Sequence, residues 1–142
     1  MTFLISLEQV PAATTVALGL GIDEGDALMR LTRWRLADEE PTVYAMSHLP
    51  VRVVPTLDPA SVRSPTFALH TYLREHHTCA PTHCRAQIFP DVATEPVATP
   101  LGLAVGTPTL RLHAQTVHHV VGPVEFAIDW IRADRFSVEL SS

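Results

Sequence analysis

Two pairs of strand-like segments, rich in Leu, Val, Thr and aromatic residues, stand out in the pattern of apolar and polar positions. Apolar and polar residues alternate within these segments, which is typical of strands that turn one face toward a core. The first pair flanks the polar turn Ala37–Pro41, and the second pair flanks the turn Val121–Pro123. Because each pair is joined by a short turn, we predict two antiparallel hairpins.

Between the hairpins, the apolar spacing predicts a helix from Thr66 to His77. Ser64 is placed to cap this helix, and Pro65 suits its first position. Two more strands are expected, one from about His83 to Phe89 and a closing strand from Phe136 to Leu140. The pattern therefore predicts an α+β domain, with an antiparallel sheet of about six strands and flanking helices.

The chain contains an internal repeat. The segment Leu20–Gly25 is echoed by Leu101–Gly106, and Pro41–Met46 is echoed by Pro123–Ile128, so the offset between the copies drifts from 81 to 82 residues. In each copy a short apolar run ends at a Leu-Gly pair, which predicts a short helix with glycine at its C-terminus and a second glycine at positive φ in the turn that follows. Two copies are too few for a solenoid, so we expect one domain, residues 1–142, with a pseudo-twofold axis.

The amino-acid composition and charge exclude several classes of protein. Apolar residues make up 46% of the 142 residues and charged residues 18%, which excludes a disordered chain. The net charge is −5, with ten Arg and no Lys. We therefore do not expect this domain to bind DNA or RNA directly. No apolar run reaches the length of a membrane span and no signal peptide opens the chain, so we expect a cytoplasmic protein without membrane contact. Two cysteines do not form a disulfide framework.

Charged side chains gather on one face of the predicted hairpins. Strand alternation places Arg33 and Arg35 on the same face, and Glu125 and Asp129 on the matching face of the second hairpin. Small residues, among them Ser47, lie beside these charges and leave room for a polar molecule. The opposite face is expected to form the core, with the large side chains Trp34, Tyr44, Met46, Phe126, Ile128 and Trp130.

This charged face has two interpretations. In the first it lines a pocket in which the two guanidinium groups hold an anion and a carboxylate accepts a hydroxyl or an amine, because the planar fork of Arg binds carboxylate or phosphate oxygens in pairs. In the second it is a solvated strand face with Arg–Glu pairs across the strands.

A cluster of His76, His77, Cys79, His83 and Cys84 contains residue types that bind zinc. Its spacing matches none of the usual ligand pairings, so we expect a helix end and a solvated loop, with no metal or other cofactor. No nucleophile elbow or activated cysteine supports covalent catalysis.

The ordered motifs between about Ala13 and Leu140 resemble a known family. Arg33-Trp34-Arg35-Leu36-Ala37-Asp38, Glu40-Pro41 and Leu49-Pro50 are similar to the first half of a UTRA domain, and Leu101-Gly102, Gly106-Thr107-Pro108, Gly122-Pro123-Val124-Glu125 and Arg132-Ala133-Asp134 are similar to the second half. UTRA domains are the effector-binding domains of HutC-subfamily GntR transcription regulators and resemble chorismate lyase in fold. The segments 69–75 and 132–134 look somewhat like the phosphonate-regulator type.

The resemblance implies a homodimer that binds a small molecule between the sheet and the segment around Ala68. It also implies a winged helix-turn-helix outside this chain that contacts DNA. The family's anion contacts fall on Arg33 and Arg35, and its acidic residue falls on Glu125. His70 stands at a family tyrosine position, while Ser47 and Asp129 are included only as strand neighbours.

Departures from the family pattern bear on the ligand. Ala68, Ala45 and Ile131 stand where the family often has a serine, an acid and a tyrosine. They argue against a phosphosugar and leave an organic acid, a phosphonate or a phosphate as the expected anionic effector. A small chorismate-lyase-like enzyme is the alternative function, because an anion site that folds its substrate is nearly all that such a reaction uses.

Overall fold

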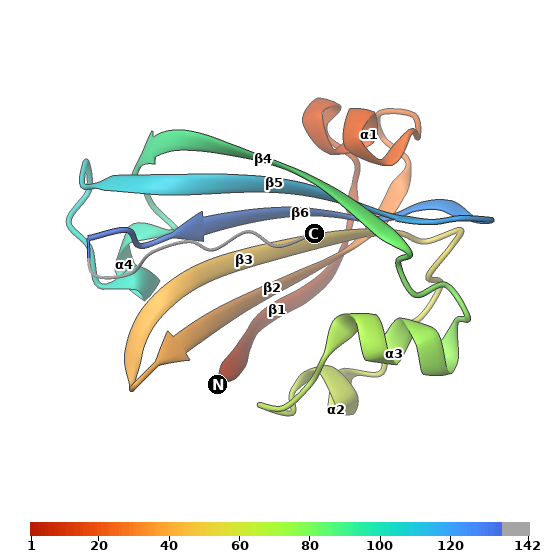
Figure 1. The fold of residues 1–142 in the computed structure, drawn as a ribbon, viewed down its shortest axis with the longest axis horizontal. Helices are drawn as coiled ribbons and strands as arrows, with labels where there is room; N and C mark the ends of the chain where they lie inside the picture. Colours follow the sequence, from red (N-terminus) through yellow and green to blue (C-terminus); the bar gives the residue numbers. More distant parts are fainter. Residues whose placement is uncertain (135–142) are drawn as a thin grey trace.

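The computed structural model describes residues 1–134 and contains one six-stranded antiparallel sheet (Figure 1). The strands lie in the order β1-β2-β3-β6-β5-β4, and every neighbouring pair is antiparallel. The predicted α+β class is therefore confirmed.

None of the helices in this part of the chain is long and apolar enough to span a membrane. The strands are β1 (Thr2–Pro11), β2 (Ala27–Ala37), β3 (Glu40–Pro50), β4 (His83–Val92), β5 (Pro108–His118) and β6 (Gly122–Ile131), and the helices are α1 (Thr14–Leu20), α2 (Pro59–Val62), α3 (Leu69–His76) and α4 (Ala98–Leu101).

The two halves of the sheet repeat each other, as the sequence predicts. Strands β1, β2 and β3 correspond to β4, β5 and β6, with the pseudo-twofold axis between β3 and β6. The turn of each half is closed by the same backbone hydrogen bond: Gly25 donates to Ala12, and Gly106 donates to Ala93. Gly25 and Gly106 have φ angles of 92° and 93°, which confirms the predicted positive φ, a conformation in which a Cβ would be strained.

One strand was missed by the sequence analysis. Strand β1 forms an edge of the sheet and pairs with β2 along its whole length. The repeat carried the signal for it, because Thr2–Pro11 precedes the first copy at the same offset at which His83–Val92 precedes the second. The predicted closing strand Phe136–Leu140 lies outside the described residues.

The prediction that a helix begins at Thr66 is wrong. Helix α3 begins at Leu69, with Ala68 at its N-cap position and no side-chain cap. Ser64 and Pro65 belong to a turn before it, in which the backbone N–H of Phe67 donates to the carbonyl of Ser64 at 3.0 Å. This turn places residues 67–71 along the sheet, beside the charged face.

Both faces of the sheet carry apolar cores, so the prediction that the core lies only on the Trp34 face is incomplete. Helix α1 packs on Phe126, and α4 packs beside Tyr44, on the face predicted to be core. Helices α2 and α3 cover part of the other face, where Leu73 joins Leu31 and Leu49 in the larger cluster (Figure 1). The charged residues on that face consequently lie beside a packed core and not on an open surface.

Candidate functional site

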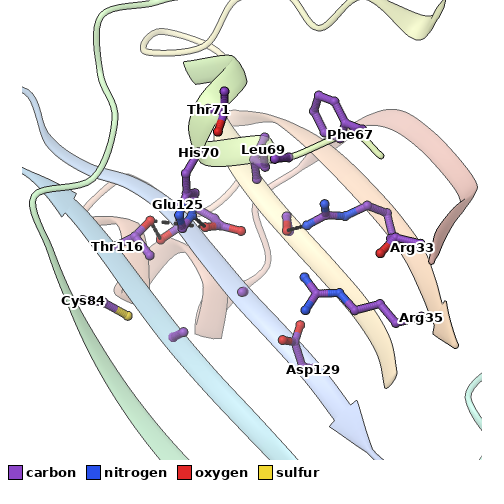
Figure 2. A pocket seen from close by; sticks show the side chains of 15 residues that line it. Arg33, Arg35, Phe67, Leu69, His70, Thr71, Cys84, Thr116, Glu125 and Asp129 are labelled. Carbon is purple, nitrogen blue, oxygen red and sulfur yellow. Dashed lines mark hydrogen bonds and ion pairs between the residues drawn. The ribbon is translucent and has the colours of Figure 1, made fainter. Parts of the chain in front are cut away.

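A cavity of about 360 Å³ lies between the sheet and the segment that leads into α3 (Figure 2). This volume is within the range of sites that hold small molecules. All six side chains chosen from the sequence line it, from β2, β3, β6 and α3. They are Arg33, Arg35, Ser47, His70, Glu125 and Asp129.

Strand register explains how residues far apart in sequence meet at this cavity. Arg33 on β2 lies opposite Ala45 on β3, and Ala45 lies opposite Asp129 on β6. Ser47 lies opposite Ala127 in the same way. Because directly opposite residues point to the same side of a sheet, these side chains share one face. The alanines add little volume, so the charged groups face a hollow.

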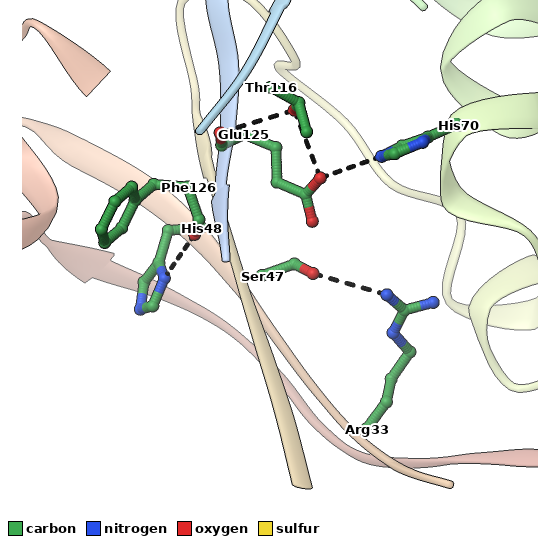
Figure 3. Close-up of polar contacts among 7 residues, drawn as sticks. All are labelled: Arg33, Ser47, His48, His70, Thr116, Glu125 and Phe126. Atoms are coloured by element: carbon green, nitrogen blue, oxygen red, sulfur yellow. Dashed lines mark hydrogen bonds and ion pairs between the residues drawn. The ribbon is translucent and has the colours of Figure 1, made fainter. Parts of the chain in front are cut away.

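Arg33 is the buried cation of the cavity. It is 6% exposed, and its Nη2 donates to Ser47 Oγ at 3.4 Å (Figure 3). Its guanidinium lies 6.0 Å from the centre of the Phe67 ring, within reach of a cation–π interaction. Burial and the neighbouring charge of Arg35 lower its pKa, although Glu125 and Asp129 oppose the shift. Its Nε–H has no hydrogen-bond partner in the part of the chain that the structure describes.

Glu125 is the buried anion, with 4% of its surface exposed. Its Oε1 accepts from His70 Nε2 at 3.0 Å and from Thr116 Oγ1 at 3.3 Å (Figure 3). Burial acts most strongly on this carboxyl and would raise its pKa, but His70, Ser47 and Arg33 together keep the pKa lowered. The His70–Glu125 pair therefore joins the first turn of α3 to β6 across the cavity.

Arg35 and Asp129 face each other at the open end of the cavity (Figure 2). Arg35 is exposed and Asp129 is half-buried. No ion pair within 4.0 Å joins the two side chains. Burial raises the pKa of Asp129 to about 6, Glu125 acts in the same direction, and the two arginines oppose it. Among residues 1–134, therefore, neither the Arg35 guanidinium nor the Asp129 carboxyl group has an ion-pair partner within 4.0 Å.

The observed contacts are not those of the second interpretation, in which a solvated strand face carries Arg–Glu pairs across the strands. Glu125 pairs with His70, and Arg33 bonds Ser47. The sequence analysis did not select Phe67 and Thr116, which also line the cavity. Thr116 was detectable from the second hairpin, because it lies directly opposite Glu125.

The His/Cys cluster does not form a metal centre in the described residues. Within residues 1–134, no group of three or more His, Cys, Asp or Glu side chains is arranged to hold a metal ion. Cys79 is buried in the α3 core, whereas Cys84 lies on β4 at the cavity. His76 and His77 stack against Tyr72.

Comparisons with known proteins agree with this architecture. Residues 2–137 match the UTRA domain family. The HTH-type transcriptional repressor NagR of Bacillus subtilis (strain 168) is 23% identical over 134 residues, which cover 94% of this chain and 54% of that protein. The chain therefore spans about half the length of this curated relative.

Solved structures share the fold over the whole chain. The ligand-binding domain of a protein assigned to the GntR family of transcriptional regulators, from Bordetella bronchiseptica, superposes with a TM-score of 0.91 at 16% identity, covering 100% of this chain and 89% of the other. A GntR-family transcriptional regulator from Enterococcus faecalis V583 has a TM-score of 0.86 at 19% identity, with 100% of both chains covered.

Fold, cavity and family match define a class: a ligand-binding regulatory domain of the kind found in GntR-family regulators. Within that class, the chain belongs to the UTRA domain family, whose model matches nearly its whole length. The resemblance seen in the sequence is confirmed at the level of the family.

Proposed function

We propose that this chain senses a small acidic metabolite in the cavity between the sheet and α3. The observation that carries the proposal is the pair of arginines on β2 whose guanidinium groups line one cavity, with the Nε–H of buried Arg33 unpartnered in the described part of the chain. Each guanidinium carries a positive charge and several N–H donors, and an anionic ligand offers acceptors of opposite charge to the donors that line the cavity. An organic acid, a phosphonate or a phosphate fits this description.

The side chains that line the cavity have different roles in the proposed binding. Arg33 and Arg35 hold the acidic group, and Ser47 orients Arg33 through its hydroxyl. Glu125 and His70 connect the ligand to α3, because their bond crosses from the sheet to the first turn of that helix. A ligand that competes with this bond, or strengthens it, changes how α3 lies on the sheet.

Regulation follows from a difference in ligand affinity between two arrangements of the protein. We propose that residues 1–142 act as one effector-binding and dimerisation domain, and that a winged helix-turn-helix outside this chain contacts DNA in the cytoplasm. The acidic net charge of −5 favours DNA contact through such a module. The ligand can shift the equilibrium by no more than its differential affinity for the two arrangements. The HutC subfamily and the phosphonate type stay predictions.

The homodimer is supported by the edges of the sheet. Strand β4 is an edge strand, and its side chains are largely exposed, Ile88 and Val92 among them. Edge strands with free backbone groups are suited to pairing with a second chain. Sedimentation at micromolar concentration should give twice the 15.6 kDa mass of the chain, and a concentration-independent monomer would contradict the dimer.

A thermal-shift screen tests the sensing function. Organic acids, phosphonates, amino acids and sugar phosphates are added singly, and a true ligand present at about 100 times its Kd should raise the melting temperature by roughly 10 °C. Neutral analogues of each hit serve as controls and should give no shift. A screen in which no acidic compound raises the melting temperature, or in which the neutral analogues raise it as much as the acids do, would contradict the proposal.

A further inference from the structure

The charges around the cavity restrict the class of ligand more narrowly than the two arginines alone. Two guanidinium groups line it, and so do two carboxyl groups, Glu125 and Asp129. A ligand carrying only negative charge would lie against both carboxylates, and like charges at close range repel. The following inference rests on the proposed function and concerns the second charged group of the same ligand.

The two carboxyl groups differ in what already binds them. Glu125 accepts hydrogen bonds from His70 and Thr116. Asp129 lines the same cavity but receives no hydrogen bond from the side chains that the structure describes, and Arg35 does not come within ion-pair distance. Burial raises the pKa of Asp129 and the negative charge of Glu125 adds to the shift, while Arg35 and Arg33 only partly oppose it.

The part of the sheet between Arg33 and Asp129 is short and carries only a small side chain. Arg33, Ala45 and Asp129 form one row across three neighbouring strands. Adjacent strands are about 4.8 Å apart, so the Cα atoms at the two ends of this row are about 10 Å apart, with only a methyl group between them. A molecule that spans this gap meets a cation on one side and a carboxyl group on the other.

We propose that the ligand is a zwitterion, whose acidic group binds Arg33 and Arg35 and whose protonated amine binds Asp129. The amine donates to the carboxylate oxygens, which keeps Asp129 ionised and supplies the partner that the described residues lack. A second basic group is unnecessary, because Glu125 is already paired with His70. The ligand class is thus an amino acid in the broad sense, with a carboxylate or a phosphonate as the acidic end.

Calorimetry on matched pairs of compounds tests the proposal with the intact chain. The ω-amino carboxylic acids with one to five methylene groups are compared with the same acids lacking the amine, and aminoalkylphosphonates are compared with alkylphosphonates. At the chain length that fits, the amino compound should bind at least 10-fold more tightly than its partner. Asp129→Asn should remove this preference, and it should not weaken binding of the amine-free acid, because it takes a like charge away from the cavity. Asp23→Asn, which removes a carboxylate from an exposed position outside the cavity, is the control and should preserve the preference.

The outcomes separate this inference from the proposed function. Amine-free acids that bind as tightly as every amino compound, with affinity dependent on Arg35, would overturn the zwitterion and leave the acid-sensing function intact. A preference for the amine that persists in Asp129→Asn would also overturn it. Failure of both series, together with failure of the wider screen to find any acid that depends on Arg35, would contradict the proposed function itself.

Discussion

Replacing Arg35 with alanine is expected to weaken binding of the acidic ligand about 100-fold, with little change in stability. A hydrogen bond to a charged group contributes about 1.5–3 kcal/mol, and 2.7 kcal/mol corresponds to roughly 100-fold in Kd. Arg35 is exposed and forms no ion pair with the described residues, so truncating it breaks no salt bridge among them. Isothermal titration with the strongest acid from the screen measures the loss.

Arg52→Ala is the matched control for this prediction. It removes the same charge from an exposed position just after β3, and Arg52 does not line the cavity. Its Kd should stay within about twofold of the unmodified chain. An equal loss of affinity in both variants would mean that net charge attracts the ligand, and the assignment of Arg35 would be wrong.

The second large effect concerns stability. Asp129→Asn should make the protein more stable at pH 8 by about 2–3 kcal/mol and should change it little at pH 4. Burial raises the pKa of Asp129 from 3.8 to about 6 in the folded protein. Between those values the folded chain holds more protons than the unfolded chain, so its stability falls as the pH rises and then levels above pH 6. One pKa unit corresponds to about 1.4 kcal/mol, and asparagine resembles the protonated carboxyl group.

Urea unfolding at pH 4, 6 and 8 measures this effect. Asp91→Asn is the control with the opposite sign, because a hydrogen bond from Val92, together with Arg111 and Trp130, lowers the pKa of Asp91. That variant should lose stability at neutral pH. If Asp129→Asn loses stability at pH 8 instead, Asp129 has a structural partner, and its proposed role in ligand binding falls with it.

The expected loss of stability caused by the Asp129 carboxylate agrees with a role for this residue in ligand binding. If Asp129→Asn stabilises the protein as expected, the Asp129 carboxylate has a desolvation cost that a bound cationic group would offset, and functional sites often carry such local penalties. A ligand with a cationic group would therefore account for a carboxylate at this position.

The repeat made much of the fold predictable. The echo of Leu20–Gly25 in Leu101–Gly106 placed two equivalent turns with glycine at positive φ, and the structure contains both. The alternation within the two hairpins does not extend to the N-terminal strand, which the repeat offset alone indicates. The start of α3 was misplaced because Ser64 and Pro65 are equally suited to a turn, and local sequence alone does not separate the two.

The residues of the site could be predicted from the sequence, but their arrangement in space could not. Period-two alternation is enough to place Arg33, Arg35 and Asp129 on one face. It does not reveal that α3 covers part of that face, and hence that Arg33 is buried and His70 reaches Glu125. Those facts depend on how the connection between β3 and β4 packs against the sheet, which involves contacts distant in sequence.

The most direct test is a crystal structure of this chain with the strongest acidic ligand from the screen. The account predicts that the ligand occupies the cavity beneath α3, with its acidic oxygens within hydrogen-bond distance of the guanidinium groups of Arg33 and Arg35. A ligand bound on the opposite face of the sheet, beside Arg30 and Tyr44, would contradict it.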